Sequence, residues 1–314
     1  MRSLVVVLLG IALQGLQPAV PVEPIGAILE RFQSFPVVAL GEGSHGDLNS
    51  LKFRLALIRD PRFSQQVNDI VVEVGNARYQ ERIDAYVRGD DLPAGIVREA
   101  CRNTTNPNMG PDYPSFEEIF HAVRAMNLTL PAERRIRILL GDPPFDWSQV
   151  RSVADLARPG GILTADRDPF VANLVLRESI AKKRRALIVY GDGHYGRSNP
   201  ASLISHLEKG GTKVFSIWTT TANGLSAWQS DAHSWPVPSL ASVRGTLLGS
   251  AMVPMWHPLP LEQQVDAVLN VGVFAPGSIP REYCNDPEYM KMRLFRLDLR
   301  GEGDQLRRFC GLTQ

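Results

Sequence analysis

The chain has 314 residues, of which 44% are hydrophobic, and this is enough apolar material for the core of one large domain or two modest ones. Its 34 basic and 33 acidic residues give a formal net charge of +1, and the charges form no long run of one sign. A chain with this balance has no field that would concentrate nucleic acid. We therefore exclude a nucleic-acid partner and expect a globular protein that acts on a small-molecule substrate.

The first twenty residues have the pattern of a secretory signal peptide. Arg2 supplies a positive charge, residues 3–13 are almost entirely apolar, and a stretch containing Gly15 and Ala19 follows. The apolar run is too short to span a bilayer comfortably. A buried first strand is the alternative, but a strand needs fewer apolar residues. We predict export with loss of residues 1–20, and a mature single domain over residues 21–314 that is periplasmic or secreted and has no membrane segment.

Six short apolar runs rich in β-branched residues predict strands at 36–42, 69–75, 135–142, 186–191, 212–219 and 265–272. Amphipathic stretches between them predict helices at 48–59, 78–88, 115–127, 169–185 and 202–209. Strands that alternate with helices of this length indicate βαβ units. The sequence therefore predicts an α/β fold with a mostly parallel sheet flanked by helices. A further apolar run at 290–299 predicts an antiparallel edge strand.

Two long segments, residues 103–114 and 223–260, have the composition of loops. The second contains Trp228, Trp235 and Trp256. Aromatic residues in long loops either cover a binding site or pack against the core. We expect these extra loops to form a lid over the site.

The chain has three cysteines, Cys101, Cys284 and Cys310, and so at most one disulfide. Cys284 and Cys310 both lie near the C-terminus, which favours this pair, but the sequence does not decide the pairing. None of the cysteines has C-x-x-C spacing, which argues against a metal clamp or a redox motif.

The first and fourth predicted strands end in related turns, GEGSHG at residues 41–46 and GDGHYG at residues 191–196. Both match G-x-G-x-x-G, the spacing of a dinucleotide-binding loop, and Glu73 follows the second strand as the ribose-binding acid of that motif would. A carboxylate at Glu42 would oppose a bound pyrophosphate, since such a loop holds the anion with bare N–H groups. We therefore favour a turn that takes part in acid/base chemistry and keep dinucleotide binding as the alternative.

Polar side chains gather where the predicted strands end. Because the carboxyl ends of parallel strands share one edge of the sheet, these residues should converge there: Glu42, His45, Glu73, Asp142, Asp192 and His194. Two imidazoles beside carboxylates can carry out general acid/base catalysis, and the same set could also bind a divalent metal. Each residue alone would more often be a helix cap or a surface residue, and only the set indicates a site. Ser44 does not lie in a G-x-S-x-G elbow, so the sequence does not support a serine hydrolase.

Several segments, taken in chain order, resemble the erythromycin esterase family. The opening pattern Gly-Glu-x-x-His-Gly is matched by Gly41, Glu42, His45 and Gly46, with Arg54 at the basic position of the next helix. The further matches are IVVEVGNAR with Glu73, IDAYVRGDD, SFEEIFHAVRAMN, RIRILLGDPP, DRDPFVANLVL, LIVYGDGHYGR and LPLEQQVDAVLNVG. Of the His-Asn-x-His often found at the fourth strand of the family, this chain retains only the last histidine, His194.

This resemblance implies hydrolysis of an ester, such as a macrolide lactone, by a water activated at His45. Glu42 and Glu73 would orient or polarise, Arg54 would help to stabilise charge, and His194 would complete the site. Asp192 and Asp142 are expected to bind substrate, and no cofactor is expected. The Gly-x-x-His at 191–194 with Glu73 also resembles the wider ChaN/Tiki superfamily of haem-uptake proteins and metalloproteases. That resemblance implies the alternative of a metal-dependent hydrolase or a haem- or ligand-binding protein.

Overall fold

The computed structural model describes residues 16–105, 112–158, 161–162, 166–253 and 259–312. Seven strands form one sheet in the order β3-β2-β4-β1-β5-β7-β6. Neighbouring strands are parallel except for the pair β6 and β7, which is antiparallel. The strands are β1 (Val37–Gly41), β2 (Asp69–Asn76), β3 (Arg137–Asp142), β4 (Ala186–Tyr190), β5 (Val214–Thr220), β6 (Ser239–Ser242) and β7 (Ala267–Asn270). The predicted α/β fold with a mostly parallel sheet is therefore confirmed.

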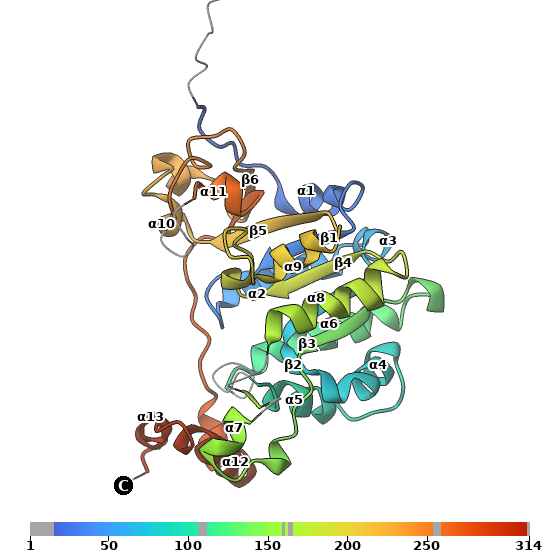
Figure 1. The fold of residues 1–314 in the computed structure, drawn as a ribbon, viewed down its shortest axis with the longest axis vertical. Coiled ribbons are helices and arrows are strands. Elements are labelled where there is room, and N and C mark those ends of the chain that lie inside the picture. The colour runs from blue at the N-terminus through green and yellow to red at the C-terminus, as the bar shows by residue number, and fades with distance from the viewer. Residues whose placement is uncertain (1–15, 106–111, 159–160, 163–165, 254–258, 313–314) are drawn as a thin grey trace, which may run out of the picture.

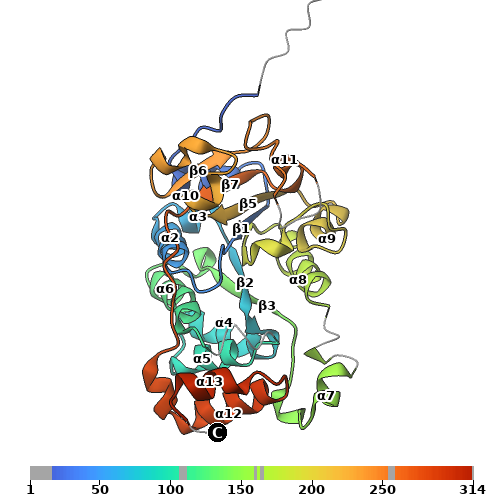
Figure 2. The ribbon, with the colours of Figure 1, turned by 90° about the vertical axis from the view of Figure 1, so that its left-hand side faces the viewer.

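Helices cover both faces of the sheet, and they sort by chain order. Val38 and Leu40 of β1 join the core with α1 to α6, whereas Val37 and Ala39 join the opposite core with α8, α9 and α11. This alternation follows from the two-residue period of a strand. Figure 2 shows the sheet between α2 and α6 on one side and α8 and α9 on the other. These helices are α1 (Pro24–Arg31), α2 (Leu48–Arg59), α3 (Phe63–Gln66), α4 (Gln80–Arg88), α5 (Gly95–Arg102), α6 (Glu117–Asn127), α8 (Arg167–Val175), α9 (Leu203–Lys209) and α11 (Leu261–Gln264).

The C-terminal helices α12 (Pro287–Asp298) and α13 (Gly303–Phe309) lie away from the sheet, near α5 and the short α7 (Val153–Ala157) (Figure 1). The predicted strand at 290–299 is therefore wrong. Asp286 caps the helix by accepting from the N–H groups of Glu288 and Tyr289, and Pro287 stands in its first turn. Tyr289, Met290, Arg293 and Leu297 are buried at helical spacing. The antiparallel edge is instead β6, four residues long, inside a segment predicted as loop.

The disulfide Cys284–Cys310 is confirmed, with the two Cα atoms 5.3 Å apart, and Cys101 is buried and free. The lid expectation fails for Trp228 and Trp235, the two tryptophans of the segment 223–260 that the structure describes, because both pack against the core. Trp235 is buried in the core. Trp228 follows α10 (Ala222–Leu225), and its ring packs edge-on against Trp218 of β5. Trp256 lies outside the described residues. Within the described parts of the chain, no helix is long and apolar enough to cross a membrane.

Candidate functional site

The site lies at the carboxyl edge of the sheet, where β1, β2 and β4 end beside one another. Glu42 and His45 stand in the turn between β1 and α2, and His194 stands in a single 3₁₀ turn after β4. Glu73 belongs to β2, at a point where the register against β3 shifts between Val72 and Asn76. Such an irregularity re-aims a side chain out of the regular pleat. The backbone thereby brings together four of the predicted catalytic residues.

Glu42 and His45 form a close pair. The His45 Nδ1 lies 2.9 Å from the Glu42 Oε2, and the carboxylate is buried while the imidazole is 39% exposed. Burial lowers the pKa of His45, but the hydrogen bond and the charge of Glu42 outweigh it, so the pKa is raised above its ordinary value. With the proton on Nδ1 donated to Glu42, the Nε2 lone pair is free to act as a base.

His194 has a different carboxylate partner. Its Nδ1 bonds to Asp168 of α8, and its Nε2 lies 3.5 Å from the Glu73 Oε1. Burial lowers the pKa of His194, yet these two carboxylates raise it to about 9. At neutral pH His194 is therefore an imidazolium.

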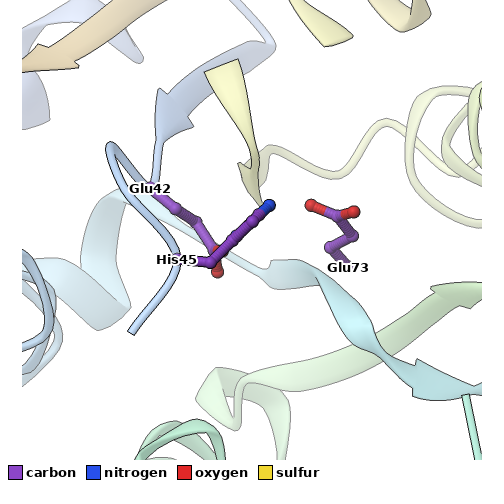
Figure 3. A group of neighbouring side chains, drawn as sticks. All are labelled: Glu42, His45 and Glu73. Atoms are coloured by element: carbon purple, nitrogen blue, oxygen red, sulfur yellow. The ribbon is translucent and has the colours of Figure 1, made fainter. Parts of the chain in front are cut away.

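Glu73 links the two histidines. Its Oε2 accepts from the Gly191 N–H at 2.8 Å, and its Oε1 lies 3.0 Å from the Arg167 Nη2. Burial raises the pKa of Glu73, but His194, Arg167 and His45 together hold it well below its usual value. In Figure 3 the tip of the His45 ring faces the Glu73 carboxylate, with Glu42 on the other side of the ring. Glu73 therefore stays ionised beside the cations Arg167 and His194.

A cavity of about 360 Å³, the rim cavity, opens in front of these groups. Both catalytic histidine candidates line it, His45 from one turn and His194 from the other. The rest of the wall includes Thr219 to Thr221 and the apolar side chains of Trp218, Val271 and Phe274. A Cβ at position 191 would lie 2.9 Å from the His45 Cε1, so glycine at this position allows the imidazole its place against the second turn.

The first glycine-rich turn does not offer a pyrophosphate its N–H groups. The Gly43 N–H donates to the Asp192 Oδ2 at 2.7 Å. At the start of α2 the Asn49 N–H is bonded to the Asp47 side chain and the Leu48 N–H to the Ala275 carbonyl. Dinucleotide binding needs these groups free. The geometry therefore disfavours the dinucleotide alternative.

Three predicted site residues take supporting positions. Asp192 lines the rim cavity, but its two oxygens accept from the N–H groups of Gly43 and Thr219, and burial raises its pKa to about 7. Asp142 is fully buried against the Thr105 N–H and hydroxyl, and burial raises its pKa to about 6. Arg54 lies behind Glu42, with its Nη1 2.7 Å from the Ser50 Oγ and 3.4 Å from the Glu42 carbonyl oxygen. Neither Asp142 nor Arg54 lines the rim cavity.

Sequence reasoning did not single out Asp168 and Arg167, although both belong to the segment DRDPFVANLVL. Asp168 orients His194, and Arg167 holds Glu73. Both stand in the first turn of α8, which packs on the face of the sheet opposite to α2. Acidic residues are common at the start of helices, where they stabilise the helix end. The sequence pattern therefore does not distinguish Asp168 from such a residue.

Glu42, His45 and Glu73 also have the composition of a metal site. One ligand atom from each lies within 4.8 Å of the other two. Two carboxylates and an imidazole suit a divalent cation such as Zn²⁺. However, the Glu42 oxygen is bonded to His45, and Glu73 is shared between Gly191 and Arg167. A cation here would have to compete with Arg167 and with protonated His194.

Comparisons with known proteins bear on the fold alone. No protein-family model matches the sequence, and no curated protein does. A crystal structure of a succinoglycan biosynthesis protein aligns with a TM-score of 0.58 at 10% identity, covering 84% of this chain and 96% of that one. A protein from Bacillus cereus aligns with a TM-score of 0.54 at 12% identity, covering 84% and 97%.

The haem-binding ChaN of Campylobacter jejuni aligns with a TM-score of 0.45 at 12% identity, covering 80% of this chain and 93% of that one. The two alignments with TM-scores above 0.5, to the succinoglycan biosynthesis protein and to the Bacillus cereus protein, show a shared α/β architecture. The chain therefore has the fold of those two structures, and its chemistry has to be argued from its own residues.

Proposed function

We propose that the protein hydrolyses an ester or lactone of a small molecule with a water that His45 activates. One observation carries the proposal: a histidine on the wall of the rim cavity has its Nδ1 held by a buried carboxylate. This is the arrangement in which a carboxylate fixes the tautomer of a general base. Resemblance of the opening motif to erythromycin esterases supports the same reaction.

The reaction balances with the groups present. His45 Nε2 removes a proton from water as the water oxygen attacks the ester carbonyl. The tetrahedral intermediate then collapses, and the proton on His45 passes to the departing alcohol oxygen. We assign to the imidazolium of His194, which lines the same cavity, the stabilisation of the negative charge that develops. Glu42 and Asp168 keep the two rings in place.

The two histidines differ in a way that suits this division of work. A base must be neutral and a charge-stabilising group must be cationic at the same pH. Two carboxylates hold His194 protonated, whereas His45 is bonded to one and is more exposed. These surroundings favour the proton on His194 more strongly than the proton on His45, which is the order that an acid/base pair requires.

We further propose that the protein is exported. Its N-terminal pattern is that of a signal peptide, and the Cys284–Cys310 disulfide suits an oxidising compartment. N-terminal sequencing of the protein recovered from outside the cytoplasm should show a start near residue 21. Recovery of the full-length chain from the cytoplasm would contradict this.

A metal-dependent hydrolase is the second candidate, because Glu42, His45 and Glu73 converge. If a divalent ion were bound there, these three residues would hold it, and it would supply a water of lowered pKa. The reaction would then depend on the ion and be lost with a chelator.

The test is hydrolysis of small aryl esters and one macrolide by the wild type and by His45→Ala, each with and without a chelator. We expect His45→Ala to lower kcat/KM by about 10³-fold, the usual scale of general-base catalysis, with no effect of chelator on the wild type. His233→Ala is the matched control, because His233 is exposed and distant in the chain from the site residues. Chelator sensitivity would favour the metal-dependent candidate. Absence of turnover in folded protein would leave a ligand-binding role.

A further inference from the structure

A second hollow lies beside the rim cavity. It has a volume of about 760 Å³, and we call it the apolar groove. Side chains from α1, α2 and the segments next to β6 and β7 line it, among them Ile25, Phe53, Ala56, Val237, Val271 and Val273. None of these side chains takes part in the proposed acid/base chemistry.

The groove and the rim cavity share a wall. Val271 lines both hollows, while Phe274 lines only the cavity and Val273 only the groove. Val273 is 68% exposed and Phe274 50%, which is high for side chains of this kind. Hydrogen bonds hold the backbone of this segment, from the Val271 N–H to the Thr220 carbonyl and from the Asn49 Nδ2 to the Val273 carbonyl. A fixed apolar ridge therefore leads from one hollow to the other.

The groove offers few polar groups to a ligand. Glu23 lines it, but its carboxylate accepts from the N–H groups of Ile25 and Gly26 at the start of α1. Lys52 and Asn49 complete the polar part of the lining, and Asn49 is bonded to Val273. The rim cavity, by contrast, is lined by the two histidines together with Ser44, Asp47 and Asp192. The two hollows thus suit the two ends of an amphipathic molecule.

We propose that the apolar groove binds the aliphatic part of the substrate, so that the protein prefers esters with a medium-length hydrocarbon chain over short ones. The ester group would lie at His45 and the chain would cross Val271 and Phe274 into the groove. This inference rests on the proposed hydrolysis and names its substrate class. Its energetic basis is burial of methylene groups against apolar side chains.

The kinetic test compares p-nitrophenyl acetate, butyrate, hexanoate and octanoate. We expect kcat/KM of the wild type to rise by about tenfold or more from acetate to octanoate, because each buried methylene contributes up to about fourfold. Ala56→Trp fills the groove from an exposed position on α2 and should bring the octanoate-to-acetate ratio back toward one. Ala125→Trp is the matched control, because Ala125 is exposed on α6 and lines an unrelated hollow. A wild-type ratio near one, or an equal ratio in both variants, would overturn the inference.

A binding measurement separates this inference from the proposed hydrolysis. Octanoate has no ester bond, so its binding to the wild type by calorimetry does not depend on turnover. We expect binding that Ala56→Trp weakens by about tenfold and Ala125→Trp preserves. Octanoate binding without hydrolysis of any ester would contradict the proposed hydrolysis and support the groove as a binding site for an aliphatic chain. Hydrolysis without octanoate binding, or a wild-type dimer that only Ala56→Trp dissociates, would contradict the groove as a substrate site.

Discussion

The two glycine-rich turns have nearly the same sequence pattern, and the structure uses them in opposite ways. In the first turn, Glu42 points to His45 three residues later and holds its Nδ1. In the second turn, Asp192 points away from His194 and binds the N–H groups of Gly43 and Thr219, while His194 takes its carboxylate from Asp168. The acid and the histidine are three residues apart in the first turn and two residues apart in the second. An acid near a histidine in sequence is therefore not by itself its partner.

The largest expected effect tests the acid of the first turn. Glu42→Gln keeps the shape of the side chain but removes the charge that fixes the His45 tautomer. We expect kcat/KM for an aryl ester to fall by about 10²- to 10⁴-fold, with thermal unfolding little changed. Unchanged kcat/KM in this variant would show that Glu42 does not orient a base.

The corresponding acid of the second turn should affect stability. Asp192→Ala leaves the buried N–H group of Thr219 and the partly buried N–H group of Gly43 without acceptors. We expect the free energy of unfolding in urea to drop by about 2–4 kcal/mol, because each unsatisfied buried group costs about 1–3 kcal/mol. Asp91→Ala, at an exposed position, is the control and should change it little. Equal stability of Asp192→Ala and Asp91→Ala would contradict a structural role for Asp192 in the second turn.

A smaller effect concerns the pH dependence. His45 must lose its proton to act as base, so the rate should rise with pH through its pKa; His194 must keep its proton, so the rate should fall above about pH 9. Asp168→Asn removes a carboxylate that raises the His194 pKa, and the falling limb should move to lower pH by about one unit. A falling limb that stays at the same pH in this variant would show that it does not arise from His194.

The smallest effect is expected at Ser44, which lines the rim cavity beside His45. If water is the nucleophile, Ser44→Ala should leave kcat/KM within about twofold, well below the 10²-fold scale of a catalytic group. A covalent acyl-enzyme detected by mass spectrometry in the wild type and absent from the variant would assign the nucleophile to Ser44 instead.

The alternation of apolar runs with amphipathic stretches was enough to predict the α/β class and the parallel strands. It was not enough at 290–299, where a run with apolar residues at Met290, Met292 and Leu294 was predicted to be a strand. A helix forms there because the Asp286 side chain accepts hydrogen bonds from N–H groups of its first turn, and because Pro287 is favoured at the first helical position. The short β6 was missed because four residues carry too little periodicity to register.

The sequence by itself determined which polar residues reach the edge of the sheet, because residues that end parallel strands share that edge. It placed Glu42, His45, Glu73 and His194 there. Only the tertiary structure decided their partners: the folding of α8 back over the sheet brings Asp168 to His194 and Arg167 to Glu73. It also placed Arg54 behind Glu42 and buried Asp142 against Thr105. Hydrogen bonds depend on direction and on distances of about 3 Å, and neither is written in the spacing of residues along a chain.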